Sequence, residues 1–224
     1  MALGAPGASL TIRPINSYTL QHDTTTHYHR KHWEERAMIG KKNIVFGLLF
    51  LVLTAGLGPY MVTQLYPAVG EAQTAKQTAM SNIQLMASNN FEQDLEPMSA
   101  EQIARANTAG LLTLNQQLNA RAPVDAIKGG PHAHGNLEAL LNIAIGVVLC
   151  FVAVSVAFKQ LISWLFILGT LLHSGLLYLV TVFSLPWAGQ LLDLGIGPIM
   201  ILLGLLLAGI AVAIGFRGAL VTDA

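Results

Sequence analysis

Two apolar segments of the chain contain residues that could bind a metal or move protons. His132, His134 and Glu138 open one segment, and His173 lies in the middle of another. In a helix, Glu138 lies one turn after His134 and Asn142 one turn after Glu138, so these three residues form a polar stripe. A carboxylate inside an apolar helix is costly unless it faces a bundle interior, a partner or water. Imidazole and carboxylate are ligands of copper, iron and zinc, so the pattern predicts a metal, haem or proton-handling site.

We assign candidate roles to these residues. His134 and His173 are candidate ligands of a haem or a metal, not necessarily of the same centre. Glu138 would orient a ligand or handle protons, while Asn142 and Asp193 would give polar support. The alternative is that His134 and Glu138 line the water interface, that His173 bonds to Asn142 or a backbone carbonyl, and that Asp193 is interfacial. The candidate metal ligands are His132, His134, Glu138 and His173.

Other motifs point away from several activities. Residues 22–32 hold four of the seven histidines. Arg30 and Lys31 lie among them and oppose a bound dication, so a solvated or partner-bound basic tail is favoured over a metal site. The chain has no Walker loop, no dinucleotide fingerprint, no zinc-protease motif and no CxxC or CxxCH. Nucleotide hydrolysis, c-type haem and thiol redox chemistry are therefore not expected.

The composition is that of a membrane protein. Of the 224 residues, 53% are hydrophobic and 11% are charged, against about 25% charged residues in soluble domains. The formal net charge is zero, so no global field would recruit nucleic acid. The first 42 residues lack the apolar core of a signal peptide, so the first apolar segment is expected to remain as an anchor.

Four segments are long and apolar enough to cross a hydrocarbon core of about 30 Å. The predicted spans are residues 43–66, 137–158, 161–183 and 191–216. Lys41, Lys42, Lys159 and Arg217 flank these spans on one side, which predicts that both chain ends are cytoplasmic. We therefore expect an all-α protein with four transmembrane helices in a bundle, integral to a cell (inner) membrane. The other segments are an N-terminal tail over 1–42, an external, periplasmic-side loop over 67–136 and a C-terminal tail over 217–224.

The long external loop is expected to be partly helical. Residues 71–89 have helix-compatible spacing, and a second helix is predicted to start after Ser99, with Gln102 at the capping-box position. Pro97 and Pro123 are expected to bracket this second helix. A helical hairpin that lies over the outer face or docks on a partner follows from this pattern.

Residue counting places the candidate ligands at different depths. At 1.5 Å per residue from a turn near Lys159, His173 lies about 21 Å and His134 about 37 Å up the helices. The gap of about 16 Å predicts that these histidines are not two axial ligands of one haem.

The motif His132-Ala133-His134-Gly135-Asn136, which leads directly into an apolar helix, resembles small membrane proteins related to haem–copper oxidase subunit I. The resemblance covers about a dozen residues and implies a haem b-type or copper site near the outer face, with His134 at the matching position. The chain continues with Leu137-Glu138-Ala139 where those proteins have Leu-Leu-Gly, and it lacks the twelve helices of an oxidase core.

Three functions are consistent with the sequence. The first is a small subunit or relative of a respiratory, electron-transfer complex with haem b, copper or iron; any enzyme it belongs to would be a membrane oxidoreductase or oxygenase. The second is a non-catalytic assembly subunit that binds other membrane proteins through the hairpin. The third is a small transporter, suggested by a Gly-x-Gly-Pro motif at residues 56–59 and again at 195–198, since both could break a helix. The lipid bilayer is the expected surroundings in each case.

Overall fold

The computed structural model of the chain describes residues 38–221 and 223. The histidine-rich run at 22–32 lies outside these residues. The first part of the described chain is one nearly continuous helical run over Ile39–Ser88, which spans about 75 Å at 1.5 Å per residue. It consists of α2 (Met38–Ala55), α3 (Leu57–Tyr60), the π-helical turn η1 (Met61–Leu65) and α4 (Tyr66–Ser88).

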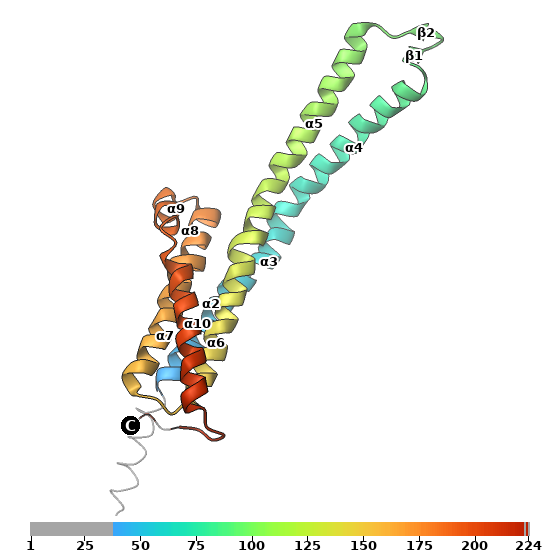
Figure 1. Cartoon of the computed structure of the whole chain (residues 1–224). Coiled ribbons are helices and arrows are strands. Elements are labelled where there is room, and N and C mark those ends of the chain that lie inside the picture. The colour runs from blue at the N-terminus through green and yellow to red at the C-terminus, as the bar shows by residue number, and fades with distance from the viewer. Residues whose placement is uncertain (1–37, 222, 224) are drawn as a thin grey trace, which may run out of the picture. The chain divides into compact units, whose positions relative to one another are not determined.

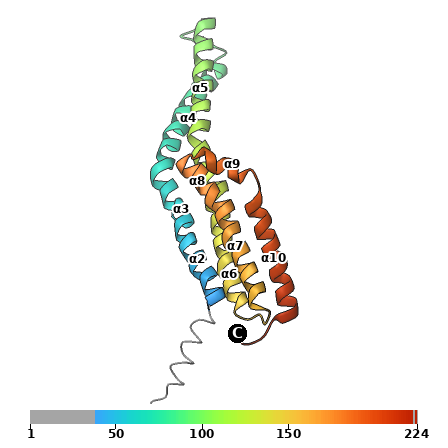
Figure 2. The same cartoon turned by 90° about the vertical axis from the view of Figure 1, so that its left-hand side faces the viewer.

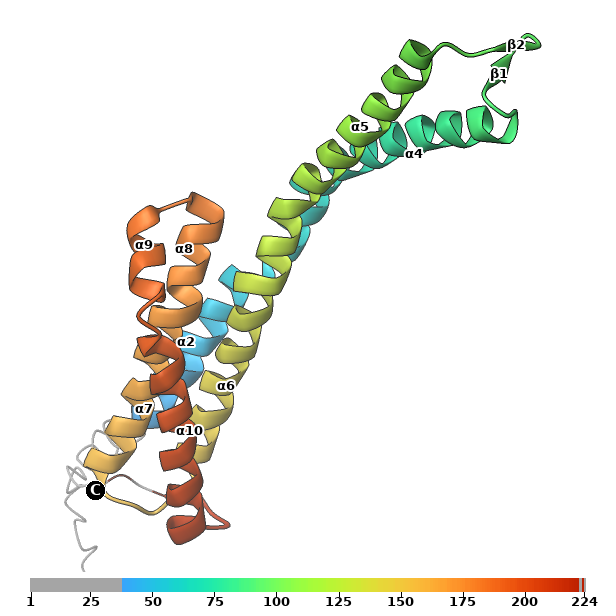
Figure 3. The same cartoon turned by 45° about the horizontal axis from the view of Figure 1, so that its top comes forward.

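A second helical run returns alongside the first. It consists of α5 (Ala100–Ile127), the π-helical turn η2 (Lys128–His132) and α6 (Ala133–Leu149). Two short antiparallel strands, β1 (Glu92–Gln93) and β2 (Glu96–Pro97), join α4 to α5, and Figure 3 shows them at the tip of the α4–α5 hairpin. The predicted helical hairpin is therefore present, and both its helices are longer than expected.

The start of α5 has the capping arrangement that the sequence predicts. The Ser99 hydroxyl accepts a hydrogen bond from the Gln102 backbone N–H at 3.2 Å, and the Gln102 side chain accepts one from the Ser99 backbone N–H at 2.8 Å. The expectation that Pro123 ends this helix is wrong. The helix continues to Ile127 because Val124 and Ile127 are buried against α3 and η1, and this packing outweighs the loss of one backbone hydrogen bond at proline.

We expect Ser99→Ala to loosen the first turn of α5 without changing the rest of the protein. The loss of an N-cap side chain costs about 0.5–2 kcal/mol, so amide hydrogen exchange in residues 100–104 should speed up roughly 2- to 30-fold. Ser81→Ala, at an exposed position inside α4, is the matched control and should leave exchange in α5 unchanged. Equal protection of α5 in the two variants would contradict the capping role.

The C-terminal part of the described chain holds five further helical elements. They are α7 (Val156–Thr170), the π-helical turn η3 (Leu171–Gly175), α8 (Leu176–Phe183), α9 (Pro186–Leu192) and α10 (Ile196–Gly215). By length and composition, three helical runs of the described chain could cross a membrane: Ile39–Ser88, Val156–Phe183 and Ile196–Gly215. The fold is thus all-helical with three candidate spans, and α6, at 17 residues, is not among them.

The structure corrects the predicted helix over 137–158, which ends nine residues early at Leu149. The next residues pair instead with the end of α10 and the residues after it: the Arg217 N–H donates to the Phe151 carbonyl at 2.8 Å, and the Ala153 N–H donates to the Gly215 carbonyl at 2.7 Å. Ser155 then caps a new helix by accepting from the Phe158 N–H. Hydropathy does not reveal this break because the paired segment is as apolar as the helix it interrupts.

Lys159 is consequently not in a turn between helices. It lies in the first turn of α7 with a fully buried side chain, and its ammonium group is paired with the Asp223 carboxylate. The predicted span over 191–216 is also divided. Residues 193–195 interrupt it, and Gly195 has a φ of +66°, a left-handed conformation that glycine adopts without strain.

The interior of the helical core contains very close helix contacts. α2 packs along α6 and α7 packs along α10 (Figures 1 and 2). At the α2–α6 contact, a Cβ atom added to Gly146 would lie 2.6 Å from the Gly40 carbonyl oxygen. At the η3–α10 contact, a Cβ added to Gly197 would lie 2.6 Å from the His173 backbone nitrogen. Small residues at such contacts let helix backbones approach each other, and here they bring α2 close to α6 and η3 close to α10.

Candidate metal centre

The helical runs that carry the candidate ligands His134 and His173 are both distorted near these residues. His134 lies in the first turn of α6, directly after η2, where Gly130 has the non-helical angles φ −98° and ψ −111°. His173 lies within η3, which interrupts the helical run over 156–183. Single π-helical turns inside α-helices frequently occur at functional sites. η3 is such a turn, whereas η2 is a kink at Gly130; both adjoin the same group of side chains.

Glu138 is the buried centre of this group. Its residue is only 4% exposed, yet both carboxylate oxygens have a partner from η3. The Ser174 hydroxyl donates to Oε2 at 2.6 Å, and Oε1 is in contact with Nδ1 of His173. A buried carboxylate is tolerated only when it is paired or hydrogen-bonded, and this one is held on both sides.

His134 and His173 meet next to this carboxylate. Their ring centroids are 5.1 Å apart with an interplanar angle of 67°, an edge-to-face contact. One potential ligand atom from each of His134, Glu138 and His173 lies within 4.8 Å of the others. His134 is exposed, His173 is partly buried and Glu138 is buried, so the group extends from the surface into the protein.

The predicted gap of about 16 Å between the two histidines is wrong, because it relied on the misplaced turn. Counted from Leu149, where α6 ends, His134 lies 15 residues up, or about 22 Å. Counted from Val156, where α7 begins, His173 lies 17 residues up, or about 26 Å. The six residues between these two helices add no helical rise, so the histidines are nearly level.

The structure places His132 apart from this group. Its Nδ1 is 3.0 Å from the Thr54 backbone carbonyl of α2, and since a carbonyl only accepts, that nitrogen carries the proton. The Asn136 amide is 3.5 Å from the same nitrogen. His132 therefore joins η2 to α2. It is not a member of the metal-suited group, which consists of His134, Glu138 and His173.

Asn142 is buried one turn below Glu138 and is hydrogen-bonded to three neighbouring groups. Its amide nitrogen donates to the Glu138 backbone carbonyl at 3.0 Å and to the Thr170 hydroxyl at 2.9 Å, and its oxygen accepts from the Asn43 amide at 3.1 Å. Asn43 also bonds to Ser163 of α7. These contacts link Asn142 to the backbone of Glu138 and to α2 and α7, and its polar-support role in a metal site stays a prediction. Within the described residues no hydrogen bond joins Asn142 to His173, whose Nδ1 contacts Glu138.

Asp193 lies elsewhere. It is exposed in the interruption between α9 and α10 and is not part of the metal-suited group. The interfacial alternative for Asp193 stays a prediction.

Sequence reasoning missed Ser174, Asn43, Ser163 and Thr170. Their common signal is a small polar side chain within an apolar helix, which must find a hydrogen-bond partner when buried. Ser174 directly follows a candidate ligand, whereas Asn43 follows two lysines and therefore looks like an interfacial residue in the sequence.

The arrangement can hold either a metal ion or a proton. With Nδ1 of His173 facing a carboxylate, Nε2 of the same ring is free to ligate, which is the carboxylate–histidine–metal arrangement common in metalloproteins. His134 supplies the second imidazole. Nitrogen ligands with a nearby carboxylate suit copper, zinc and iron. Without a metal, the His173–Glu138 pair would hold a proton.

No protein family, curated protein or solved structure matches the chain. The resemblance of the His132–Asn136 motif to relatives of haem–copper oxidase subunit I therefore stays a prediction.

Proposed function

We propose that the chain is a small integral membrane subunit of an electron-transfer complex, and that it holds one transition-metal ion between His134 and His173. The observation that carries this proposal is the grouping of His134, Glu138 and His173, whose potential ligand atoms lie within 4.8 Å of one another. In this proposal Glu138 orients His173, and Ser174 orients Glu138. Copper and iron are the ions that would also carry an electron.

The proposed membrane arrangement has four spans, with α6 as the fourth. The 17 residues of α6 extend about 26 Å, which is close to the hydrocarbon thickness. Basic residues favour the cytoplasmic side of a membrane. Near one end of α2, α7 and α10 lie Lys42, Lys159 and Arg217, and the metal-suited group lies towards the other end of the helical core. This arrangement puts both chain ends in the cytoplasm, and the α4–α5 hairpin and the metal group on the outer side.

A metal ion fits the histidine pair better than a haem does. Two axial ligands need a nitrogen on each side of the porphyrin at about 2 Å from the metal, with the whole macrocycle between the rings. The rings of His134 and His173 are in edge-to-face contact at 5.1 Å, which leaves no slot for a macrocycle. A haem with a single histidine ligand is the remaining haem alternative.

A second candidate function, an assembly subunit, is favoured by the surface of α5. Leu111, Leu112 and Leu118 are each more than half exposed on a hairpin that would lie outside the membrane, and exposed apolar side chains of this kind mark interaction surfaces. The transporter alternative has less support: of its two Gly-x-Gly-Pro motifs, the one at 56–59 lies inside the nearly continuous helical run Ile39–Ser88, where Gly56 keeps helical backbone angles.

The test is metal analysis, together with oxidised and reduced absorption spectra, on the full chain purified in mild detergent. We expect about one equivalent of copper or iron and no Soret band. A correctly folded, metal-free chain that also fails to take up added Cu²⁺, Fe²⁺ or Zn²⁺ would overturn the metal site and leave the assembly function. A strong Soret band would replace the ion with a haem.

A further inference from the structure

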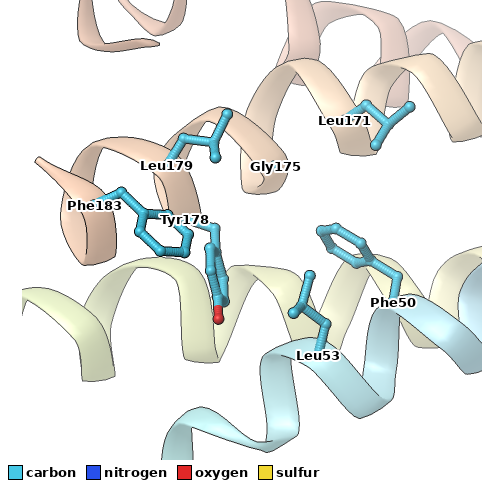
Figure 4. Close-up of a pocket in the computed structure, with 7 residues that line it drawn as sticks. All are labelled: Phe50, Leu53, Leu171, Gly175, Tyr178, Leu179 and Phe183. Atoms are coloured by element: carbon cyan, nitrogen blue, oxygen red, sulfur yellow. The ribbon is translucent and has the colours of Figure 1, made fainter. Parts of the chain in front are cut away.

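An apolar groove lies between α2 and the η3–α8 run (Figure 4). Its volume is about 390 Å³. Phe50 and Leu53 of α2 form one wall, and Leu171 of η3 with Tyr178 and Leu179 of α8 form the other. The groove is thus bounded by the two helical runs Ile39–Ser88 and Val156–Phe183, both long and apolar enough to cross a membrane.

The groove is open at Gly175 because that residue has no side chain. A Cβ atom added there would have its nearest neighbours at 3.7–3.9 Å, in Thr170 and Leu171 of its own helical run. These are ordinary contacts, so the space over Gly175 is not needed for helix packing. Phe183 at the end of α8 also lines the groove. Leu53, Leu171 and Phe183 are each at least 42% exposed, so the groove opens to the surroundings of the helices.

The chemistry of the lining selects a hydrocarbon ligand. Six of the seven lining residues have no polar side-chain atom, and the Tyr178 hydroxyl is the one exception. We infer that this groove binds one acyl chain of a membrane glycerophospholipid. This inference rests on the membrane placement in the proposed function, but not on the metal site.

Two other occupants fit less well. A helix of a second copy or of another subunit would need small residues along its path for close approach. The edges of the groove are instead formed by Leu53, Leu171 and Phe183, and Gly175 is its one small lining residue. A quinone has two carbonyl oxygens at opposite ends of its ring, and the groove offers a single hydroxyl. A flexible, purely apolar acyl chain needs neither a path of small residues nor polar partners for carbonyl oxygens.

The test uses the full chain, reconstituted in bilayers of phosphatidylethanolamine and phosphatidylglycerol and then released from mild detergent for native mass spectrometry. We expect one retained phospholipid on the wild-type chain. Gly175→Leu fills the groove from its η3–α8 wall and should reduce that occupancy at least tenfold. Leu171→Trp narrows the groove from an exposed position and serves as a second variant if Gly175→Leu does not fold.

Gly209→Leu is the matched control, because a Cβ at Gly209 in α10 would meet no atom within 4 Å. It adds the same side chain to another exposed, apolar helix position outside the groove and should keep the wild-type occupancy. The inference is overturned if the wild-type chain retains no phospholipid, or if the groove variants retain as much as Gly209→Leu. It is also overturned if chain purified from native membranes carries an isoprenoid quinone that the groove variants lose. Metal content measured on the same samples separates failure of this groove from failure of the proposed metal site.

Discussion

His173→Ala should remove the metal ion from the purified chain. In the proposed site, Nε2 of His173 is one of two imidazole ligands, and the His134 ring that contacts it would be left as a single, exposed imidazole. Removing a partner that only orients a ligand already lowers metal affinity about 10- to 100-fold, so the loss of the ligand itself should exceed 100-fold. Titration with Cu²⁺ or Zn²⁺ against a competing chelator measures this change directly.

His132→Ala is the matched control for this experiment. It removes a histidine from the same region, but one whose Nδ1 bonds to the Thr54 carbonyl instead of facing the metal group. We expect His132→Ala to keep metal affinity within a few-fold of wild type. Equal metal binding by His132→Ala and His173→Ala would contradict the assignment of His173 as a ligand.

Glu138→Gln separates the orienting role of Glu138 from direct ligation. A glutamine keeps one oxygen, which can accept from Nδ1–H of His173, whereas its amide nitrogen takes the place of Oε2 and donates to the Ser174 hydroxyl oxygen. The substitution removes the charge. If Glu138 only orients His173, the substitution should lower metal affinity about 10- to 100-fold. A loss as large as that of His173→Ala would instead make the Glu138 carboxylate a direct ligand.

The helical elements were largely predictable because their signals are local. Long apolar runs identify the helices that could cross a membrane, and Ser99 with Gln102 marks the start of α5 through a contact between residues three apart. The break after Leu149 was not predictable in this way. Residues 150–154 are apolar like a helix, and their backbone pairing with the end of α10 and the residues after it shows that they are not helical.

In the candidate site, too, local features were predictable from the sequence and long-range contacts were not. The helical spacing of His134, Glu138 and Asn142 correctly placed them on one face of α6, since that spacing depends on a single helix. The distance between His134 and His173 depended on where one helix ends and the next begins, so an error of nine residues at Leu149 became an error of many ångströms. Ser174 escaped notice because its contact with Glu138 joins residues 36 positions apart.

Gly146→Ile should be strongly destabilising, because the α2–α6 contact leaves no room for a side chain. A Cβ atom at Gly146 would lie 2.6 Å from the Gly40 carbonyl oxygen and 3.0 Å from the Ile44 backbone nitrogen. Backbone atoms of α2 cannot move aside without separating the two helices. Overpacking of this kind costs about 1–3 kcal/mol or more, and we expect a clearly lower unfolding midpoint, followed by circular dichroism in a denaturing-detergent titration.

Gly209→Ile tests whether this effect comes from the contact and not from the substitution itself. Both glycines lie in the interior of apolar helices, but a Cβ at Gly209 meets no atom within 4 Å. Replacing glycine inside a helix is favourable by a few tenths of a kcal/mol or more, so Gly209→Ile should be neutral or slightly stabilising. A Gly146→Ile midpoint equal to that of Gly209→Ile would contradict the close α2–α6 contact. Because α6 carries His134 and Glu138, the destabilised variant should also hold its metal less tightly, whereas Gly209→Ile should not.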